Sequence, residues 1–197
     1  MPIRAVIFDY GGVVVQMMDE TPRQELADRL EIGLENLYTH VFESESARQG
    51  SRGEISFAQH WDYVCEQLGV PEAEQAAILE AFLAADGVDQ GLVAWMRELR
   101  KQYKIGLLSN AWDNLRGLLV ERWQVAGEFD DLVISAEVGM VKPDRRIYEL
   151  AVQRLGVLPE EVAFFDDILE NVQGAQAAGL QAYQYTDVEQ ARRDLKV

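Results

Sequence analysis

A small set of side chains in this 197-residue sequence has the types needed to hydrolyse a charged ester. The set comprises three aspartates, a serine and a lysine: Asp9, Ser109, Lys142, Asp166 and Asp167. A carboxylate can attack phosphorus and form a covalent intermediate. A hydroxyl and an ammonium group can bind the oxygens that carry negative charge during the transfer. These types predict phosphoryl transfer with Asp9 as the nucleophile and with Ser109 and Lys142 on the phosphoryl oxygens.

The three aspartates also predict a bound cation. Asp9, Asp166 and Asp167 would repel one another if brought together, which opposes the ionisation of all three. A hard divalent ion with oxygen ligands removes this conflict. We therefore expect Mg²⁺ to be held by Asp9, Asp167 and Asp166, with a backbone carbonyl of the loop after Asp9. This ion would provide the local positive charge that a chain of formal net charge −16 lacks.

Backbone N–H groups beside these side chains are expected to complete the phosphate site. The candidates are Gly11, Gly12, Asn110 and Ala111. The two glycines lack a Cβ atom, so their backbone can approach a phosphate closely. Ser109 and Asn110 could also cap a helix, and capping is compatible with phosphate binding.

Four further residues have open roles at this stage. Asn171 could orient the acidic loop or face solvent, and Trp112 could line the pocket or simply pack. Arg48 and Arg52 are candidates to meet an anionic substrate, although they could equally lie on the surface.

Strands are predicted close before most of these groups. Short, mostly apolar runs occupy residues 3–8, 105–108 and 162–165, and weaker ones occupy residues 132–134 and 181–183. They lack strict alternation, which is typical of strands covered on both faces of a parallel sheet. Ligands of open α/β sheets bind beyond the carboxyl ends of the strands. The candidate residues therefore fall at one edge of the predicted sheet.

Helical spacing alternates with these strands from about residue 87 to the end. Apolar residues recur at three- and four-residue steps in residues 88–103, 147–155 and 168–175. Pro143 suits the first turn of the second of these helices. The alternation predicts a doubly wound α/β fold with right-handed crossovers.

Residues 16–86 follow a different pattern, in which no strand is visible. Apolar stripes in residues 26–30, 34–42, 57–68 and 77–82 predict a small helical bundle, with a loop at Gly50 and Gly53. Hinges are expected near residues 16–21 and 84–89. The predicted domains are a core of residues 1–15 and 87–197 and a helical domain of residues 16–86.

Four segments of the chain resemble the motifs of the haloacid dehalogenase (HAD) superfamily. In chain order they are Phe8-Asp9-Tyr10-Gly11-Gly12-Val13, Leu108-Ser109-Asn110, Lys142-Pro143-Asp144, and Phe164-Phe165-Asp166-Asp167 with Asn171. The helical domain is similar to the cap of the family's first subclass. The resemblance implies a Rossmann-like core of sheet order 3-2-1-4-5 and a cap that closes over the substrate. It also implies Mg²⁺ bound by Asp9, the carbonyl of Gly11 and Asp167.

One position departs from the family pattern. Most phosphatases of the superfamily carry a second aspartate two positions after the nucleophile, where it protonates the leaving group and later activates water. Here that position is Gly11, as in a branch similar to sugar-phosphate phosphatases. General acid–base catalysis typically contributes about 10²–10⁴-fold. A good leaving group, a cap residue or a metal-bound water would have to replace it.

Three functions are compatible with these residues. The leading hypothesis is a Mg²⁺-dependent phosphatase that cleaves a small phosphomonoester, such as a sugar phosphate, through an aspartyl-phosphate. The second is a metal-independent 2-haloacid dehalogenase, which Gly11 permits but which the Asp166-Asp167 pair disfavours. The third is a non-catalytic protein that binds a phosphate ligand.

The composition limits the expected partners and location. A net charge of −16 repels nucleic acid and anionic lipid, because phosphate binding relies on Lys and Arg. No stretch approaches the ~20 continuous apolar residues of a membrane helix. Residues 3–8 have the pattern of a strand and lack that of a signal-peptide core. We therefore expect a cytoplasmic protein whose partner is a small phosphate ester, without nucleic-acid or membrane partners.

Overall fold

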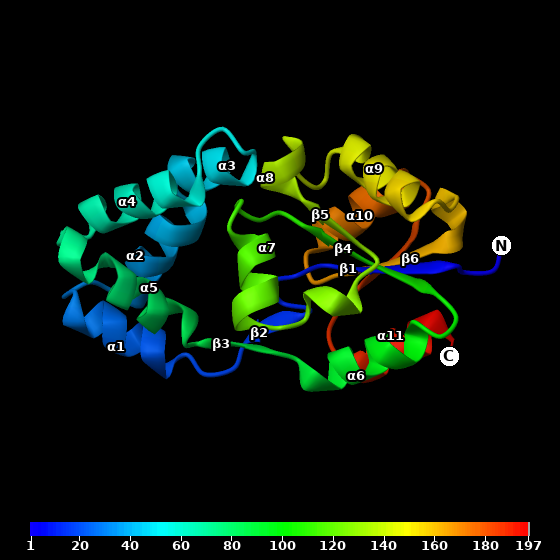
Figure 1. Cartoon of the computed structure of the whole chain (residues 1–197), viewed down its shortest axis with the longest axis horizontal. Coiled ribbons are helices and arrows are strands. Elements are labelled where there is room, and N and C mark those ends of the chain that lie inside the picture. Colours follow the sequence, from blue (N-terminus) through cyan, green and yellow to red (C-terminus); the bar gives the residue numbers. More distant parts are fainter. Residues whose placement is uncertain (197) are drawn as a thin grey trace.

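The computed structural model describes residues 1–196, and Figure 1 shows them as two lobes. The lobe on the right is built on a sheet and carries both chain ends. The lobe on the left consists of helices from residues 21–83. The chain passes between the lobes at residues 15–17 and again at residues 86–88, so the helical lobe is an insertion in the sheet lobe.

Five parallel strands form the main sheet of the described residues. They are β1 (Ala5–Phe8), β4 (Lys104–Ser109), β5 (Asp131–Ile134), β6 (Val162–Asp166) and β7 (Gln181–Gln184). Their spatial order is β5-β4-β1-β6-β7, and each neighbouring pair is parallel. Counted along the chain this order is 3-2-1-4-5, which confirms the α/β fold class. All five predicted strands are present, with ends shifted by one or two residues.

Helices cover both faces of this sheet because successive strand side chains point to opposite faces. Val6 and Phe8 of β1 pack in one apolar cluster with α6 (Gln90–Leu99) and α11 (Val188–Leu195). Ala5 and Ile7 pack in a second cluster with α9 (Arg145–Leu155) and α10 (Leu169–Ala177). Figure 1 shows the first pair of helices below the sheet and the second pair above it. The central strand is therefore buried on both faces, as its unbroken apolar run indicates.

The prediction that Pro143 lies in the first turn of a helix is wrong. Helix α9 begins at Arg145, and the Asp144 side chain caps it by accepting a hydrogen bond from the Arg146 N–H at 2.9 Å. An aspartate is a better N-cap than the residues around it, so the helix starts two residues later than Pro143 suggests.

The left lobe has its own apolar core, to which every predicted stripe contributes. Its α-helices are α1 (Thr21–Arg29), α2 (Leu34–Tyr38), α3 (Glu45–Ser51), α4 (Phe57–Gln67) and α5 (Gln75–Leu83). Leu26, Leu37, Val64 and Ile78 are buried together in this cluster. Two short helices, α7 (Leu115–Gly117) and α8 (Ser135–Val138), complete the α-helices of residues 1–196. No helix in this part of the chain is long and apolar enough to cross a membrane.

The predicted loop at Gly50 is wrong, because Gly50 lies inside α3. A Cβ atom at this position would come within 2.7 Å of the Trp112 ring. The glycine therefore allows a close contact between the lobes, whereas Gly53, with φ +70°, lies in the turn after α3.

A second sheet of two short strands joins the lobes. Strands β2 (Val15–Met17) and β3 (Asp86–Val88) pair antiparallel, with Gln16 opposite Gly87. The sequence predicts hinges here and no strand, and the second part of that prediction is wrong. Each strand has only three residues, and the middle residue of β3 is Gly87. Such short segments have too few residues to produce an alternating pattern.

Candidate active site

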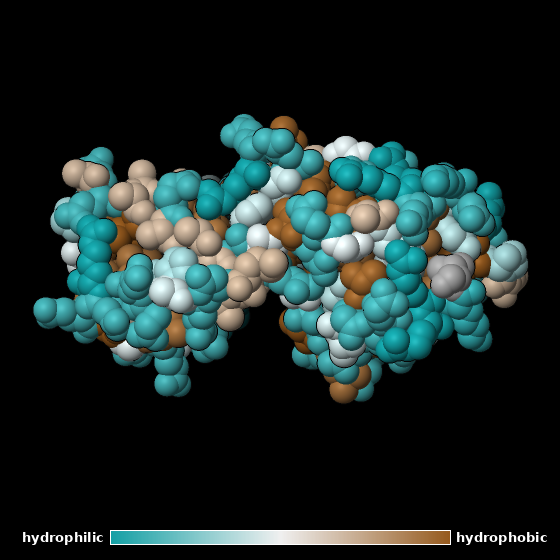
Figure 2. All heavy atoms as spheres, turned by 90° about the horizontal axis from the view of Figure 1, so that it is seen from below, coloured by the Kyte–Doolittle hydropathy of each residue, from teal (hydrophilic) through white to brown (hydrophobic). Residues whose placement is uncertain are grey.

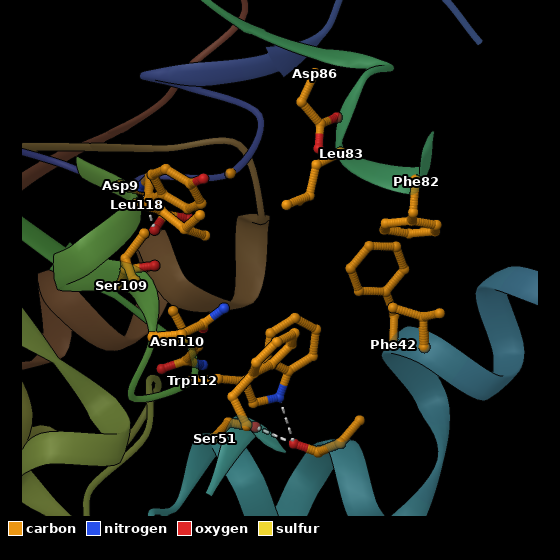
Figure 3. Close-up of a pocket in the computed structure, with 18 of the residues that line it drawn as sticks. Asp9, Phe42, Ser51, Phe82, Leu83, Asp86, Ser109, Asn110, Trp112 and Leu118 are labelled. Carbon is orange, nitrogen blue, oxygen red and sulfur yellow. Dashed lines mark hydrogen bonds between the residues drawn. The ribbon is translucent and has the colours of Figure 1, made fainter. Parts of the chain in front are cut away.

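The candidate residues meet at the carboxyl edge of the main sheet, next to one cavity of about 400 Å³. Asp9 directly follows β1, Ser109 ends β4 and Asp166 ends β6. Lys142 precedes α9 and is only 4% exposed. Figure 3 shows Asp9, Ser109 and Asn110 on one side of the cavity, opposite Phe42 and Phe82 of the helical lobe.

The Lys142 ammonium group is fully engaged by this edge of the sheet. Its Nζ lies 2.9 Å from Asp9 Oδ1, 2.6 Å from Asp166 Oδ2 and 3.1 Å from the carbonyl oxygen of Leu108. An ammonium group has three N–H donors, and three acceptors surround it here. Lys142 therefore orients Asp9, with no donor left over for a substrate oxygen in this arrangement.

Asn110 holds the backbone of Lys142. Its Oδ1 accepts a hydrogen bond from the Lys142 N–H at 2.7 Å, and its Nδ2 donates to the Lys142 carbonyl at 2.9 Å. The loop that carries the lysine is thereby tied to the end of β4, which explains how a residue far along the chain reaches Asp9.

The acceptor positions of Asp166 are all occupied within the protein. Oδ1 accepts from the Ile168 N–H at 2.8 Å and from Asn171 Nδ2 at 3.1 Å. Oδ2 accepts from Lys142 Nζ at 2.6 Å and from Asn171 Nδ2 at 3.2 Å. A carboxylate offers about four lone-pair positions in total. Asp166 is thus suited to positioning Lys142, and Asn171 orients the acidic loop.

Asp9 and Asp167 have carboxylate oxygens that the described residues leave free. Asp9 Oδ1 accepts from the Tyr10 N–H at 2.7 Å and faces Lys142, while its Oδ2 has no hydrogen-bond partner in residues 1–196. Asp167 Oδ1 is buried without a partner there. A buried carboxylate oxygen without a donor is costly unless a cation binds it.

The arrangement fits a divalent cation. Asp9, Asp166 and Asp167 each have a carboxylate oxygen within 4.8 Å of the others, although the acceptor positions of Asp166 are already used. Three carboxylates and one ammonium group leave two negative charges, which one divalent ion would neutralise. Oxygen donors are those that Mg²⁺ prefers. The carbonyl oxygen of Gly11 accepts no hydrogen bond from the described part of the chain, so it is also available to a cation.

The protein's own charges do not fully compensate these carboxylates. Burial raises the pKa of Asp9 to about 6, an effect that Lys142 opposes and Asp166 reinforces. Burial, and then the neighbouring charge of Asp166, also raise the pKa of Asp167. A cation between Asp9 and Asp167 would favour the ionised form of both groups.

Gly11 and Gly12, which follow Asp9 closely, differ in their surroundings. Gly12 has φ +74°, and a Cβ atom there would lie 2.7 Å from Asp167 Cγ, so glycine is what lets Asp167 approach. Gly11 has open space around it, with no heavy atom within 4 Å of an ideal Cβ position.

Two of the four predicted phosphate-binding N–H groups are used inside the protein. The Gly12 N–H donates to the Val15 carbonyl at 2.9 Å, and the Ala111 N–H donates to Ser135 Oγ at 3.0 Å. The N–H groups of Gly11 and Asn110 have no acceptor among residues 1–196. This arrangement leaves these two groups and the Ser109 hydroxyl for a substrate.

The sequence did not single out the aromatic wall opposite Asp9 as part of a site. Phe42, Phe57, Trp61 and Phe82 line the cavity, although they belong to stripes that predict a helical core. Their spacing is that of an ordinary buried helix face, so the sequence held no signal that these rings line a cavity. Trp112 also lines the cavity, as one of its two predicted roles requires.

Three comparisons with known proteins agree with this geometry. A family model described as haloacid dehalogenase-like hydrolase matches residues 3–179. A sesquiterpene phosphatase of Aspergillus oryzae is 31% identical, over 93% of this chain and 90% of that protein. A glyceraldehyde 3-phosphate phosphatase of Methanopyrus kandleri is 27% identical, over 90% of this chain and 82% of that protein.

The fold is also similar to a solved structure. A HAD-family enzyme of Bacteroides thetaiotaomicron, in complex with magnesium and inorganic phosphate, matches with a TM-score of 0.80. It is 23% identical and covers 96% of this chain and 98% of its own. The two chains therefore share the sheet lobe and the helical insertion in one common fold.

Proposed function

The chain belongs to the haloacid dehalogenase-like hydrolase family, and on that premise we propose that it is a Mg²⁺-dependent phosphatase acting on a small phosphomonoester. The observation that carries the proposal is the cluster of Asp9, Asp166 and Asp167 carboxylates next to the cavity, in which Asp167 has a buried oxygen without a partner among the described residues. The names of the two phosphatases from Aspergillus oryzae and Methanopyrus kandleri support the same reaction class.

In this proposal Asp9, Asp167 and the Gly11 carbonyl hold the cation. Asp166 is assigned to positioning Lys142, because its acceptor positions are already used. When bound, Mg²⁺ would offset the negative charge of the phosphoryl group and of the carboxylates around it.

Asp9 acts as the nucleophile. One oxygen of the Asp9 carboxylate attacks phosphorus while the other would face the cation; the bond from phosphorus to the ester oxygen breaks, and the alcohol leaves with the electron pair and takes a proton from solvent. Water then attacks the aspartyl-phosphate, loses a proton to solvent and releases inorganic phosphate, which restores the Asp9 carboxylate. Ser109 and the N–H groups of Gly11 and Asn110 donate hydrogen bonds to the phosphoryl oxygens throughout, where positioning and charge stabilisation supply most of the catalysis.

Residues 16–86 are assigned to a cap over this site. The helical lobe contributes one wall of the cavity and is joined to the sheet lobe through β2 and β3. Its contacts would exclude water from the phosphoryl group and determine which alcohol fits.

Phosphate release from a panel of phosphomonoesters tests the proposal. We expect turnover with Mg²⁺, none after EDTA, and a loss of more than about 10³-fold in Asp9→Asn, because the nucleophile is removed. Mass spectrometry of the denatured enzyme after a short reaction should detect one phosphoryl group on Asp9. Undiminished turnover in EDTA, or an active Asp9→Asn variant, would contradict the mechanism.

The same assay separates the dehalogenase alternative. A 2-haloacid is an anion, and without a cation it would face a cluster with two uncompensated negative charges. Halide release from 2-chloropropionate in EDTA would favour that alternative over the phosphatase.

A further inference from the structure

The cavity beside Asp9 has two chemically different ends. Its sheet end carries the charged and polar groups described above. Its other end is formed by residues 41–83 of the helical lobe, among which Ser51 is the one polar lining residue of the described chain. Asp86 of β3 also lines the cavity, beside Leu83, and its Oδ2 is paired with Arg23 Nη2 at 2.6 Å. Figure 3 shows the rings of Phe42 and Phe82 side by side, facing the cavity from the helical lobe.

The aromatic rings at this end form a continuous wall. Phe42 is stacked on Trp112, with ring centroids 6.1 Å apart and planes 7° from parallel, and its centroid lies 5.6 Å from that of Phe82. Phe57 also contacts Trp112, with ring centroids 5.5 Å apart. Phe42 nevertheless remains 47% exposed. A large apolar ring left exposed inside a cavity is free to contact the apolar part of a ligand.

The polar atoms of this wall are already used by the protein. Trp112 Nε1 donates to the Ala47 carbonyl at 3.2 Å, and Trp61 Nε1 donates to the Gln75 carbonyl at 3.3 Å. Ser51 Oγ donates to the Ala47 carbonyl at 2.7 Å. The hydroxyl groups of a sugar or polyol would lose water here without gaining donors in return, which is costly.

The cationic side chains of the helical lobe do not reach the cavity. Arg48 pairs with Glu45, Arg52 pairs with Glu45 and Glu54, and neither arginine lines the cavity. Arg23 is committed to Asp86 at 2.6 Å. A second anionic group on the substrate would therefore find no countercharge at this end.

We infer that the substrate is a phosphomonoester of an apolar alcohol, with its phosphate at Asp9 and its hydrocarbon against Phe42, Phe82 and Trp112; this inference rests on the proposed function. The cavity, at about 400 Å³, is large enough for a hydrocarbon group beside the phosphate and falls within the roughly 300–1,000 Å³ typical of small-molecule sites. The chemistry of the wall selects a hydrocarbon over a polyol of the same length.

The experiment compares esters that differ in the alcohol but have the same reacting bond. We would measure kcat/KM with Mg²⁺ for n-propyl to n-hexyl phosphate, and for sorbitol 6-phosphate as the six-carbon polyol. Each added methylene group that the wall buries should raise kcat/KM by about two- to fourfold. Hexyl phosphate should exceed sorbitol 6-phosphate by at least about tenfold.

A pair of variants tests whether the wall is responsible. Phe42→Gln removes a half-exposed ring of the wall, and the ratio of kcat/KM for hexyl phosphate to that for sorbitol 6-phosphate should fall by about tenfold. Tyr63→Gln is the matched control, because Tyr63 is a 40% exposed aromatic residue of α4 that does not line the cavity. This control should keep the wild-type ratio.

Acetyl phosphate separates a failed inference from a failed function, since it is activated and too small to need the wall. Release of phosphate from acetyl phosphate, together with equal or better use of sorbitol 6-phosphate than of hexyl phosphate, would overturn the inference and leave the phosphatase intact. A wild-type ratio in Phe42→Gln would also overturn it. No release of phosphate from acetyl phosphate or from any of the esters would overturn the proposed function itself.

Discussion

Gly11 stands where most phosphatases of the family place their second aspartate, and the space for that aspartate is present. No heavy atom lies within 4 Å of an ideal Cβ at Gly11, and Gly11 is not among the glycines with positive φ. A side chain can therefore be added there without strain in the backbone.

Gly11→Asp should raise kcat for alkyl phosphates by roughly 10–10²-fold, because a positioned carboxylic acid can protonate a poor leaving group. For aryl phosphates, whose leaving groups need no proton, the gain should be small. Gly11→Asn is the control, because asparagine has nearly the same volume as aspartate but no acidic proton. Equal rates in the Asp and Asn variants would show that proton delivery does not limit the reaction.

Gly12, one residue further on, should tolerate no side chain. Gly12→Ala brings a Cβ against the Asp167 carboxylate at a backbone angle of φ +74°, so Asp167 must move. We expect the Mg²⁺ concentration for half-maximal activity to rise by at least about tenfold, because a displaced carboxylate loses its fit to the cation. Gly11→Ala is the neighbouring control and should leave this concentration close to wild type, whereas an unchanged value in Gly12→Ala would contradict the crowding argument.

Residue types and spacing were sufficient to predict which side chains gather at the site. Asp9, Ser109, Lys142 and the two adjacent aspartates are brought together, as strand-end positions in a parallel sheet require. The division of labour between Asp166 and Asp167 could not be predicted. It depends on Asn171 and Lys142 filling the acceptor positions of Asp166, and such contacts between distant residues leave no local pattern.

At the scale of elements, the buried strands were the easiest to predict and the connecting strands the hardest. Burial on both faces gives β1 and β6 unbroken apolar runs. Strands β2 and β3 are three residues long and mostly half-buried, so their pairing rests on tertiary contacts that composition does not reveal. The division of the chain at residues 16 and 86 stays a prediction, although these strands lie at its two ends.

Arg23 of α1 links the helical lobe to strand β3 at the junction of the two lobes. Its Nε donates to the Phe82 carbonyl at 3.1 Å and its Nη2 donates to Asp86 Oδ2 at 2.6 Å, while its guanidinium lies 4.1 Å from the Phe82 ring centroid. A single side chain thus joins α1, the end of α5 and β3.

Arg23→Met should destabilise the protein by about 2–4 kcal/mol, because it leaves a largely buried carboxylate and a carbonyl without their donor. Amide exchange of residues 84–88 should accelerate in the same variant. Arg29→Met on the same helix breaks an exposed ion pair with Glu74 and should change stability by no more than about 0.5 kcal/mol. Urea unfolding of both variants checks the difference, and equal losses would contradict it.

At the scale of the whole molecule, cation binding should raise the free energy of unfolding, because the folded chain brings together acidic groups that repel one another. A ligand that binds only the folded state, and is present at a concentration of about 100 times its Kd, adds about 2.7 kcal/mol to the free energy of unfolding. For a domain of this size, that corresponds to a rise of roughly 5–10 °C in Tm. Thermal unfolding with Mg²⁺ and with EDTA should show this shift.

Asp167→Asn should abolish most of the Mg²⁺-dependent rise in Tm, because Asp167 carries the buried oxygen without a partner. Asp62→Asn removes one negative charge from an exposed position on α4 and should retain the full rise. A retained rise in Asp167→Asn would place the cation elsewhere.

The pairing of β2 with β3 also bears on the order in which the chain folds. Strand β1 pairs with β4 from the far side of the helical insertion, so the sheet must close a long loop before its central contacts form. Once Val15 contacts Val88, the loop that remains to be closed is about four times shorter. The free-energy cost of closing it, which is entropic, is then lower by roughly 1 kcal/mol. If the helical lobe forms first through its local contacts, the main sheet should therefore fold faster, because its strands have a shorter loop to close.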